Sequence, residues 1–120
     1  MQLGLYNDIA VGVSPAGATA WANPGVTLGG VSVGAPPDLF NLHGQNWGLA
    51  PLSPMGLREG AYALFAATLR HNMRHAGAVR IDHVMGLQRL FWIPEGAAPA
   101  DGAYVRYPFA DLAHIIALES

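Results

Sequence analysis

The segment from residue 61 to residue 82 constrains the fold more than any other part of this chain. Its apolar side chains recur at the three- and four-residue spacing of an amphipathic helix: Tyr62, Phe65, Ala66, Leu69, Met73 and Ala76. Gly77 is expected to end that helix in a left-handed conformation, and residues 78–82 are expected to form a short strand. A helix, a tight turn and a strand make the second half of a βαβ unit, so the sequence predicts an α/β fold with a parallel sheet.

Further elements are expected on both sides of this unit. Residues 2–13 are apolar and β-branched, which favours a buried strand. Ser53 and Pro54 are typical of a helix start, and Gly60 is expected to separate that short helix from the longer one. After the unit come an apolar stretch, a turn-rich segment, a short strand and a helix: residues 87–93, 94–102, 103–107 and 109 onward.

Residues 23–54 are dominated by Gly, Pro and Asn, and no regular structure is expected there. Such a stretch is far longer than the usual connection of about 4 to 6 residues, and long loops tend to be functional. We therefore expect one domain piece over residues 1–120, with an active-site loop insertion at about 23–53.

Composition excludes several classes of function. The chain has six basic residues, all Arg, against eight acidic ones, and its net charge of -2 offers no basic surface for nucleic acid. It has no Cys, which excludes disulfides and thiol-ligated metals. No apolar run approaches the roughly 18 residues of a membrane span, so a cytoplasmic protein without membrane contact is expected. Only 12% of its residues are charged, which suggests a piece of a larger protein.

Three charged residues are candidates for chemistry. Asp82 ends the predicted strand, and Asp8 lies near the end of the first one. Arg80 precedes Asp82 by two residues and so points to the same face of the strand. An Arg beside a carboxylate keeps it charged and oriented, as a carboxylate nucleophile requires. The alternative is a structural ion pair at the end of a strand.

Other polar residues carry weaker signals. His71 and His75 are four residues apart on one helix face, but the zinc-protease pattern needs Glu at position 72, which is Asn, so a solvated face is expected and no metal. Trp47 either anchors the loop or stacks on a sugar ring. The neighbouring amide and carboxylate groups suit hydroxyl-rich ligands but are also common in turns: Asp38, Asn41, Gln45 and Asn46.

Three motifs, in order along the chain, resemble those of the 4-α-glucanotransferases, glycoside hydrolase family 77. Residues 80–86 match R-I-D-H-x-x-G, and residues 34–48 look like the family's G-x-P-P-D and G-Q-x-W-G loop. Asp8 matches an Asp that ends an earlier barrel strand. The resemblance implies a partial (β/α)8 TIM barrel, of which this chain would make roughly half, since such a barrel takes about 250 residues.

The resemblance also implies roles for individual residues. Asp82 would be the catalytic nucleophile, with Arg80 as its hydrogen-bonding partner. Asp8 and His83 would contact sugar hydroxyls near the cleavage point. The loop that covers the acceptor side would contain three further substrate-binding residues: Trp47, Asp38 and Gln45.

One member of the family's catalytic set is not expected within these residues. The acid/base Glu lies on the next barrel strand of the family, after the helix that contains Glu119. The chain by itself is therefore expected to be inactive, although its parent would transfer α-1,4-glucan segments from a maltosaccharide donor to glucose or a maltosaccharide acceptor. No cofactor is implied.

Two alternatives remain open at this stage. One is a non-catalytic α-glucan-binding or scaffolding product that keeps the Trp47 loop. The other is a related amylase-type barrel, which also ends a strand with Arg-x-Asp, although the P-P-D and Q-x-W-G loop argues against it.

Overall fold

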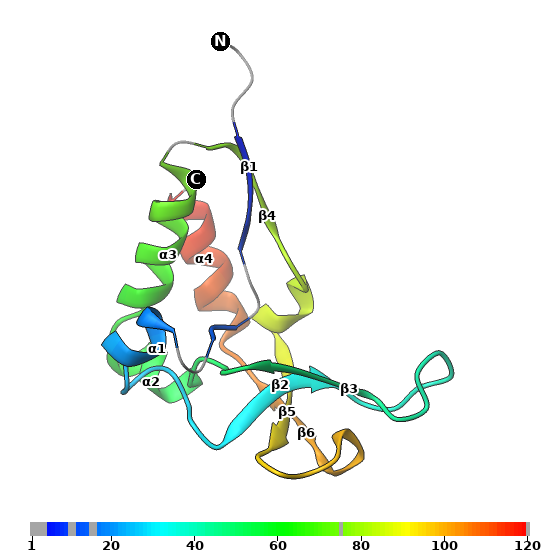
Figure 1. Cartoon of the computed structure of the whole chain (residues 1–120). Coiled ribbons are helices and arrows are strands. Elements are labelled where there is room, and N and C mark those ends of the chain that lie inside the picture. The colour runs from blue at the N-terminus through cyan, green and yellow to red at the C-terminus, as the bar shows by residue number, and fades with distance from the viewer. Residues whose placement is uncertain (1–4, 10–11, 15–16, 75, 120) are drawn as a thin grey trace.

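The computed structural model contains two sheets that lie in different halves of the molecule (Figure 1). Its described residues are 5–9, 12–14, 17–74 and 76–119. Strands β1 (Leu5–Ile9) and β4 (Ala76–Ile81) form a two-stranded parallel sheet. Helices α3 (Ala63–Met73) and α4 (Phe109–Glu119) lie beside that sheet. The parallel pairing and the α/β class are as the sequence predicted.

The parallel register fixes what lies at the carboxyl end of the two strands. Asp8 is paired with Arg80, and Ile9 with Ile81. Immediately beyond β4, the backbone N–H of Asp82 donates to the carbonyl oxygen of Ile9 at 3.1 Å. The carboxyl ends of β1 and β4, where Asp8 and Asp82 were predicted to lie, are therefore side by side.

Helix α3 is shorter than its sequence pattern indicated. It begins at Ala63 because Ala61 and Tyr62 have φ angles of 51° and 61°, which a right-handed helix does not allow. At the other end, β4 already starts at Ala76, where it pairs with Leu5 of β1. The expected left-handed stop at Gly77 is wrong, because pairing with β1 draws this glycine into the strand.

Helices α3 and α4 are joined at both ends by side-chain contacts. The Tyr62 hydroxyl donates to Asp111 Oδ2 at 2.6 Å, and Arg70 forms two hydrogen bonds with Glu119 at 2.7 and 3.0 Å. This pairing with Arg70 lowers the pKa of the Glu119 carboxyl, so the charged form is favoured. Glu119 thus has a structural contact within the helix pair.

A four-stranded antiparallel sheet occupies the other half of the molecule, in the order β3-β2-β5-β6. Its strands are β2 (Val31–Ala35), β3 (Gln45–Leu49), β5 (Arg89–Pro94) and β6 (Ala103–Arg106). The expectation that residues 23–54 lack regular structure is wrong, because β2 and β3 form a hairpin there. Pairing with the apolar strand β5 supplies the buried neighbours that this Gly-rich segment could not provide alone.

The remaining elements lie between the strands along the chain. Helix α1 (Ala18–Ala22) precedes β2, and α2 (Pro54–Glu59) precedes α3. Ser53 caps α2 as expected, since its Oγ accepts from the Gly56 N–H at 3.0 Å. Two short 3-10 turns, Val84–Leu87 and Pro99–Asp101, flank β5. Among the helices of the described residues, none has the length and apolar character needed to cross a membrane.

Candidate active site

Arg80 connects two carboxylates at the carboxyl end of the parallel sheet. Its Nη2 lies 3.1 Å from Asp82 Oδ1, and its Nε lies 3.4 Å from Asp8 Oδ1. The first contact follows from the strand period of two, since positions 80 and 82 point the same way. The second follows from the register that places Asp8 opposite Arg80. One guanidinium thus holds two carboxylates, and the trio has a net negative charge.

These three side chains remain open to solvent. Each is between 52% and 56% exposed, so water screens the ion pairs and their contribution to stability is small. The same exposure leaves the carboxylates accessible to a ligand. The arrangement therefore orients two accessible carboxylates and adds little to the stability of the fold.

His83 follows Asp82 in an unusual backbone conformation and contacts an aromatic ring from the other sheet. Its φ and ψ angles are 50° and 61°, in the left-handed region. The Trp47 ring meets the His83 ring edge to face, with 5.3 Å between the centroids. Trp47 belongs to β3, so the hairpin predicted only as a loop reaches the end of the parallel sheet.

Two other predicted loop residues have local roles. Gln45 Oε1 accepts a hydrogen bond from Trp47 Nε1 at 2.8 Å. Asp38 Oδ1 accepts from the backbone N–H groups of Phe40 and Asn41, at 2.9 and 2.7 Å, and so closes the turn at the hairpin tip. The structure brings Gln45 and Trp47 together, whereas Asp38 shapes the turn.

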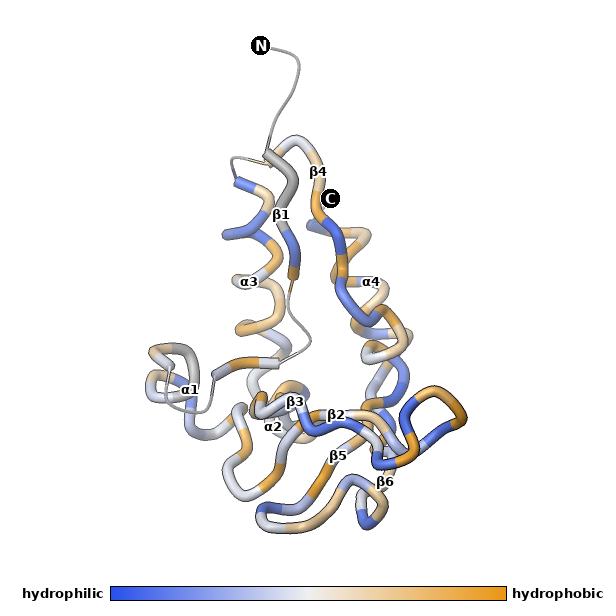
Figure 2. The backbone as a smooth tube through the Cα atoms, turned by 45° about the vertical axis from the view of Figure 1, so that its right-hand side comes forward, coloured by the Kyte–Doolittle hydropathy of each residue, from blue (hydrophilic) through white to orange (hydrophobic). Residues whose placement is uncertain are grey.

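The tip of this hairpin is strongly apolar and projects into solvent. Leu39, Phe40 and Leu42 are 93%, 100% and 75% exposed. Figure 2 shows the hydrophobic colour at the end of the loop beyond β2 and β3. An apolar, solvated loop end of this kind is typical of a surface that meets a ligand or another part of a protein.

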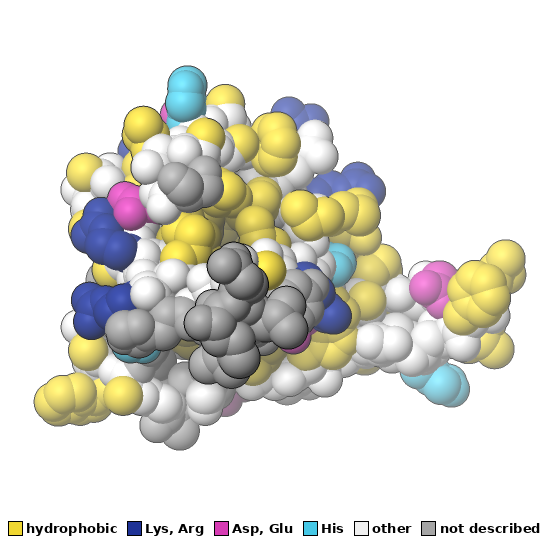
Figure 3. All heavy atoms as spheres, turned by 90° about the horizontal axis from the view of Figure 1, so that it is seen from above, with side chains coloured by type: hydrophobic (Ala, Val, Ile, Leu, Met, Phe, Trp, Pro, Cys, Tyr) yellow, Lys and Arg dark blue, Asp and Glu magenta, His cyan; other side chains and the backbone are white. Residues whose placement is uncertain are grey.

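A cavity of about 300 Å³ opens beside the two carboxylates. Asp8, Asp82 and His83 line it, together with apolar side chains of α3 and α4. Figure 3 shows the molecule from the opposite end, where β1 and β4 begin, and hydrophobic side chains are visible near the middle of that face. Sugar rings present apolar faces as well as hydroxyls, so a pocket of this mixed character suits a carbohydrate.

Sequence reasoning missed several residues that line this cavity. Thr68 and Asn72 come from α3, one helical turn apart on the face that also carries Leu69. The sequence pattern that could have indicated them is the four-residue spacing of two polar residues beside the apolar stripe of this helix. Tyr107 lines another part of the wall. Its hydroxyl donates to the Leu52 carbonyl oxygen, and partial burial raises the pKa of this hydroxyl above its usual range.

Of the two histidines considered as metal ligands, the structure describes one. His71 is exposed on α3, and His75 lies outside the described residues. Within the described ranges, no three His, Asp or Glu side chains are grouped so that they could hold a metal ion.

Comparison with known families gives one match over the whole chain. Residues 1–120 match the model of glycoside hydrolase family 77, described as 4-alpha-glucanotransferase. The chain is 52% identical over 120 residues to a 4-alpha-glucanotransferase of Mycobacterium tuberculosis and 49% identical to one of Haemophilus influenzae. It spans 17% of the length of each of these relatives.

Solved structures give the same result. The crystal structure of amylomaltase from Corynebacterium glutamicum superposes with a TM-score of 0.93 and 44% sequence identity. That match covers 99% of this chain and 17% of the amylomaltase. An amylomaltase from Streptococcus agalactiae, solved in complex with acarbose, has a TM-score of 0.89 over 98% of this chain and 26% of its own, at 21% identity, and supports the fold alone.

Proposed function

Because the chain belongs to the 4-alpha-glucanotransferase family, glycoside hydrolase family 77, we propose that it is the nucleophile-bearing part of such an enzyme. The complete protein would transfer α-1,4-glucan segments to glucose or to a maltosaccharide. The observation that carries this proposal is the orientation of Asp82 by Arg80 at the end of a parallel strand, beside a cavity. No cofactor is needed for this transfer, and a cytoplasmic location fits a substrate of intracellular maltodextrins.

In the proposed reaction, Asp82 acts twice. Its carboxylate attacks the anomeric carbon of the donor, forming a glycosyl ester as the bond to the leaving oxygen breaks and that oxygen takes a proton from a carboxylic acid. An acceptor hydroxyl then attacks the same carbon, gives its proton to the conjugate base, and releases Asp82. Two displacements on one carbon retain its configuration. The family resemblance assigns the acid to a Glu outside residues 1–120.

Arg80 and the residues around it prepare Asp82 for this reaction. The guanidinium stabilises the charged carboxylate and, through its second contact, fixes Asp8 beside it. Asp8 and His83 line the cavity, where they would accept or donate hydrogen bonds to sugar hydroxyls near the cleavage point.

The hairpin supplies the acceptor side of the proposed site. Trp47 and Gln45 form its base, and the turn closed by Asp38 presents the apolar tip. Transfer needs the acceptor hydroxyl to reach the glycosyl ester before water does, and a loop that excludes water favours that outcome. In this proposal residues 23–53 are the active-site insertion of roughly half a (β/α)8 barrel.

The test is turnover of maltotriose by the complete protein that contains this chain. We expect glucose and a ladder of longer maltosaccharides from the parent. Asp82→Asn should lower turnover by at least about 1,000-fold at unchanged melting temperature, since the amide is nearly isosteric but a poor nucleophile. Asp101→Asn, an exposed Asp on the antiparallel half, serves as the matched control and should keep parental activity. If Asp82 were only a structural ion-pair partner, Asp82→Asn would keep its turnover.

A further inference from the structure

Trp47 contacts the residue that directly follows the proposed nucleophile. Its ring meets the His83 ring edge to face at a centroid distance of 5.3 Å, and His83 is bonded in sequence to Asp82. We propose that Trp47 is a positioning residue that fixes the Asp82 carboxylate by holding His83. The proposal rests on the proposed function of Asp82 and adds to it a role in the first chemical step.

The backbone at His83 has an uncommon conformation that a neighbouring side chain can stabilise. Its φ angle of 50° lies in the left-handed region, which is uncommon for residues other than Gly, although His adopts it more often than most side chains. β4 ends at Ile81, and the chain turns through Asp82 and His83 into a 3-10 turn. A disfavoured conformation persists only where its surroundings enforce it, and the Trp47 ring is a surrounding group in direct contact.

Trp47 is itself held in place. Its Nε1 donates to Gln45 Oε1 at 2.8 Å, which fixes the orientation of the indole. The strand it belongs to is paired with β2, and β2 is paired in turn with the buried strand β5. The ring is therefore a fixed edge of the antiparallel sheet against which His83 rests.

The position of Trp47 relative to the cavity separates this role from simple stacking on a sugar. His83 lines the cavity beside Asp8 and Asp82, whereas Trp47 is not among its lining residues. The indole thus touches His83 from the side of the hairpin. Losing it should move Asp82 in the free enzyme, before any acceptor is present.

The expected consequence is a slower first displacement. A displacement of a reacting group by about 1 Å can cost about 100-fold in rate. An α-maltosyl fluoride donor isolates this step, because fluoride leaves with its electron pair as the Asp82 oxygen bonds to the anomeric carbon. Fluoride release therefore needs little acid assistance, and its rate in the first turnover, before any glycosyl ester has to break down, reports the attack by Asp82.

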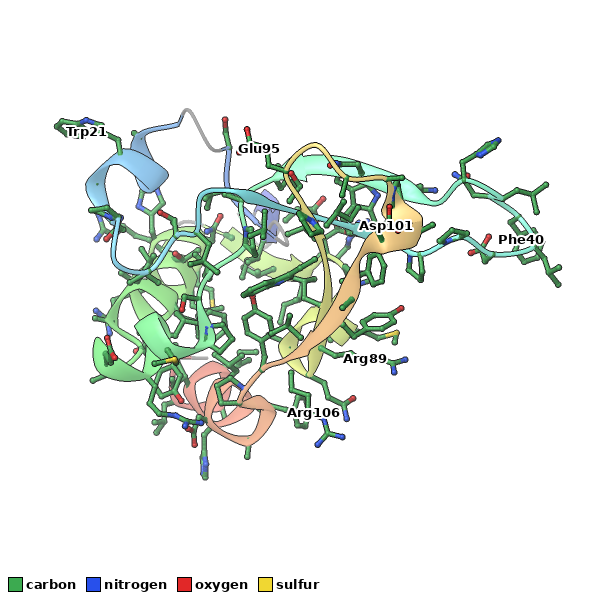
Figure 4. The ribbon with its side chains drawn as sticks, turned by 90° about the horizontal axis from the view of Figure 1, so that it is seen from below. Trp21, Phe40, Arg89, Glu95, Asp101 and Arg106 are labelled. Atoms are coloured by element: carbon green, nitrogen blue, oxygen red, sulfur yellow. The ribbon has the colours of Figure 1, made fainter. Side chains whose placement is uncertain are left out.

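The experiment measures fluoride release by the complete protein at saturating donor. Trp47→Ala should lower the first-turnover rate of fluoride release by about 10- to 100-fold, while the donor concentration that gives half of the maximal rate changes by less than about threefold. Trp47→Phe keeps an aromatic edge and should recover most of the rate, whereas Trp47→Leu, which keeps apolar bulk alone, should not. The matched control is Trp21→Ala, since this Trp is exposed on α1 at the opposite end of the molecule from the hairpin tip (Figure 4).

A double-mutant cycle tests whether the effect passes through His83. If Trp47 acts through His83, Trp47→Ala should add little to the loss already caused by His83→Ala. Fluoride release by Trp47→Ala and Trp47→Leu at the parental rate would overturn the proposal, as would independent, multiplying losses in the cycle. A parent that releases no fluoride, or Asp82→Asn releasing it normally, would instead overturn the proposed function.

Discussion

At the scale of single residues, Arg80 contacts carboxylates from two strands, Asp82 at the end of its own strand and Asp8 of the neighbouring one. Its pairing with Asp82 could be predicted from the spacing alone, because the two positions share a strand face. Its pairing with Asp8 depends on the parallel register of β1 and β4, which the sequence of either strand does not specify. A planar guanidinium suits this double contact, since its nitrogen atoms point in different directions.

Replacing Arg80 with Lys tests whether the double contact matters. An ammonium is a single point charge on a flexible stem, so it cannot hold both carboxylates in the geometry of the fork. We expect Arg80→Lys to lower the kcat for maltotriose disproportionation by about 10- to 100-fold in the complete protein, with a small change in melting temperature. Arg74→Lys, at the exposed end of α3, is the matched control. Parental kcat in Arg80→Lys would show that charge alone suffices.

The contact between Trp47 and His83 marks the limit of residue-level prediction. Each residue stood out in the sequence, Trp47 by its Gly-flanked loop and His83 by its motif. Their contact joins strands of two different sheets, so no local pattern encodes it. The same holds for Thr68 and Asn72, whose side chains line the cavity only because α3 lies against β1 and β4.

At the scale of elements, the β2–β3 hairpin is where propensity and structure disagree most. Gly34 weakens any prediction of a strand from residues 31–35, since Gly disfavours strands. The structure supplies the reason for it. A Cβ atom at Gly34 would lie 2.1 Å from the Gln45 carbonyl oxygen and 2.6 Å from Ile93 Cδ1. Because it has no side chain, Gly34 allows β2 to approach both β3 and β5. Close packing between the strands therefore requires Gly at this position.

Gly34→Ala should therefore separate β2 from β3. The added methyl group meets backbone on one side and the fully buried Ile93 on the other, and neither can move aside cheaply. Overpacking of this kind costs about 1 to 3 kcal/mol. A lower melting temperature of the complete protein is expected, with a loss of activity through Trp47. Gly29→Ala is the matched control, because a Cβ there has no atom within 4 Å; equal melting temperatures for the two variants would contradict this packing argument.

The elements around α3 were predicted more closely. Its apolar stripe, the Ser53 cap and the separation at Gly60 all depend on residues near in sequence, and all three are present. Its two ends moved inward for reasons of tertiary structure. The positive φ angles of Ala61 and Tyr62 exclude these residues from the start of α3. At the other end, residues from Ala76 onward pair with β1 and belong to β4.

At the scale of the whole molecule, two sheets of different kind meet at the candidate site. The radius of gyration is 15.0 Å, above the value of about 13.6 Å typical of a compact chain of this length. Several large apolar side chains are strongly exposed: Trp21, Leu39, Phe40, Leu42, Met55 and Leu118. Composition indicated this outcome, because few charged residues were available to cover the surface. How the sheets are oriented relative to each other could not be predicted, since it depends on contacts between distant segments.

The last prediction concerns the 120-residue chain on its own. Its parallel sheet has two strands within the described residues, and such a pair leaves backbone groups open at its edges. Together with the exposed apolar side chains, these edges should make the chain associate or adopt a loosely packed state that binds hydrophobic dyes. We expect no maltosaccharide ladder from maltotriose, because general acid catalysis is worth about 100- to 10,000-fold and the proposed acid lies outside these residues.

Sedimentation, dye fluorescence and thermal melting check this expectation together. The unit of α3 and β4 should retain most structure, because its contacts are local in sequence. A compact monomer with one cooperative melt and no dye binding would contradict the prediction. In that case the exposed apolar side chains would be compatible with independent folding, and a chain that binds glucan without turning it over would become the better account of residues 1–120.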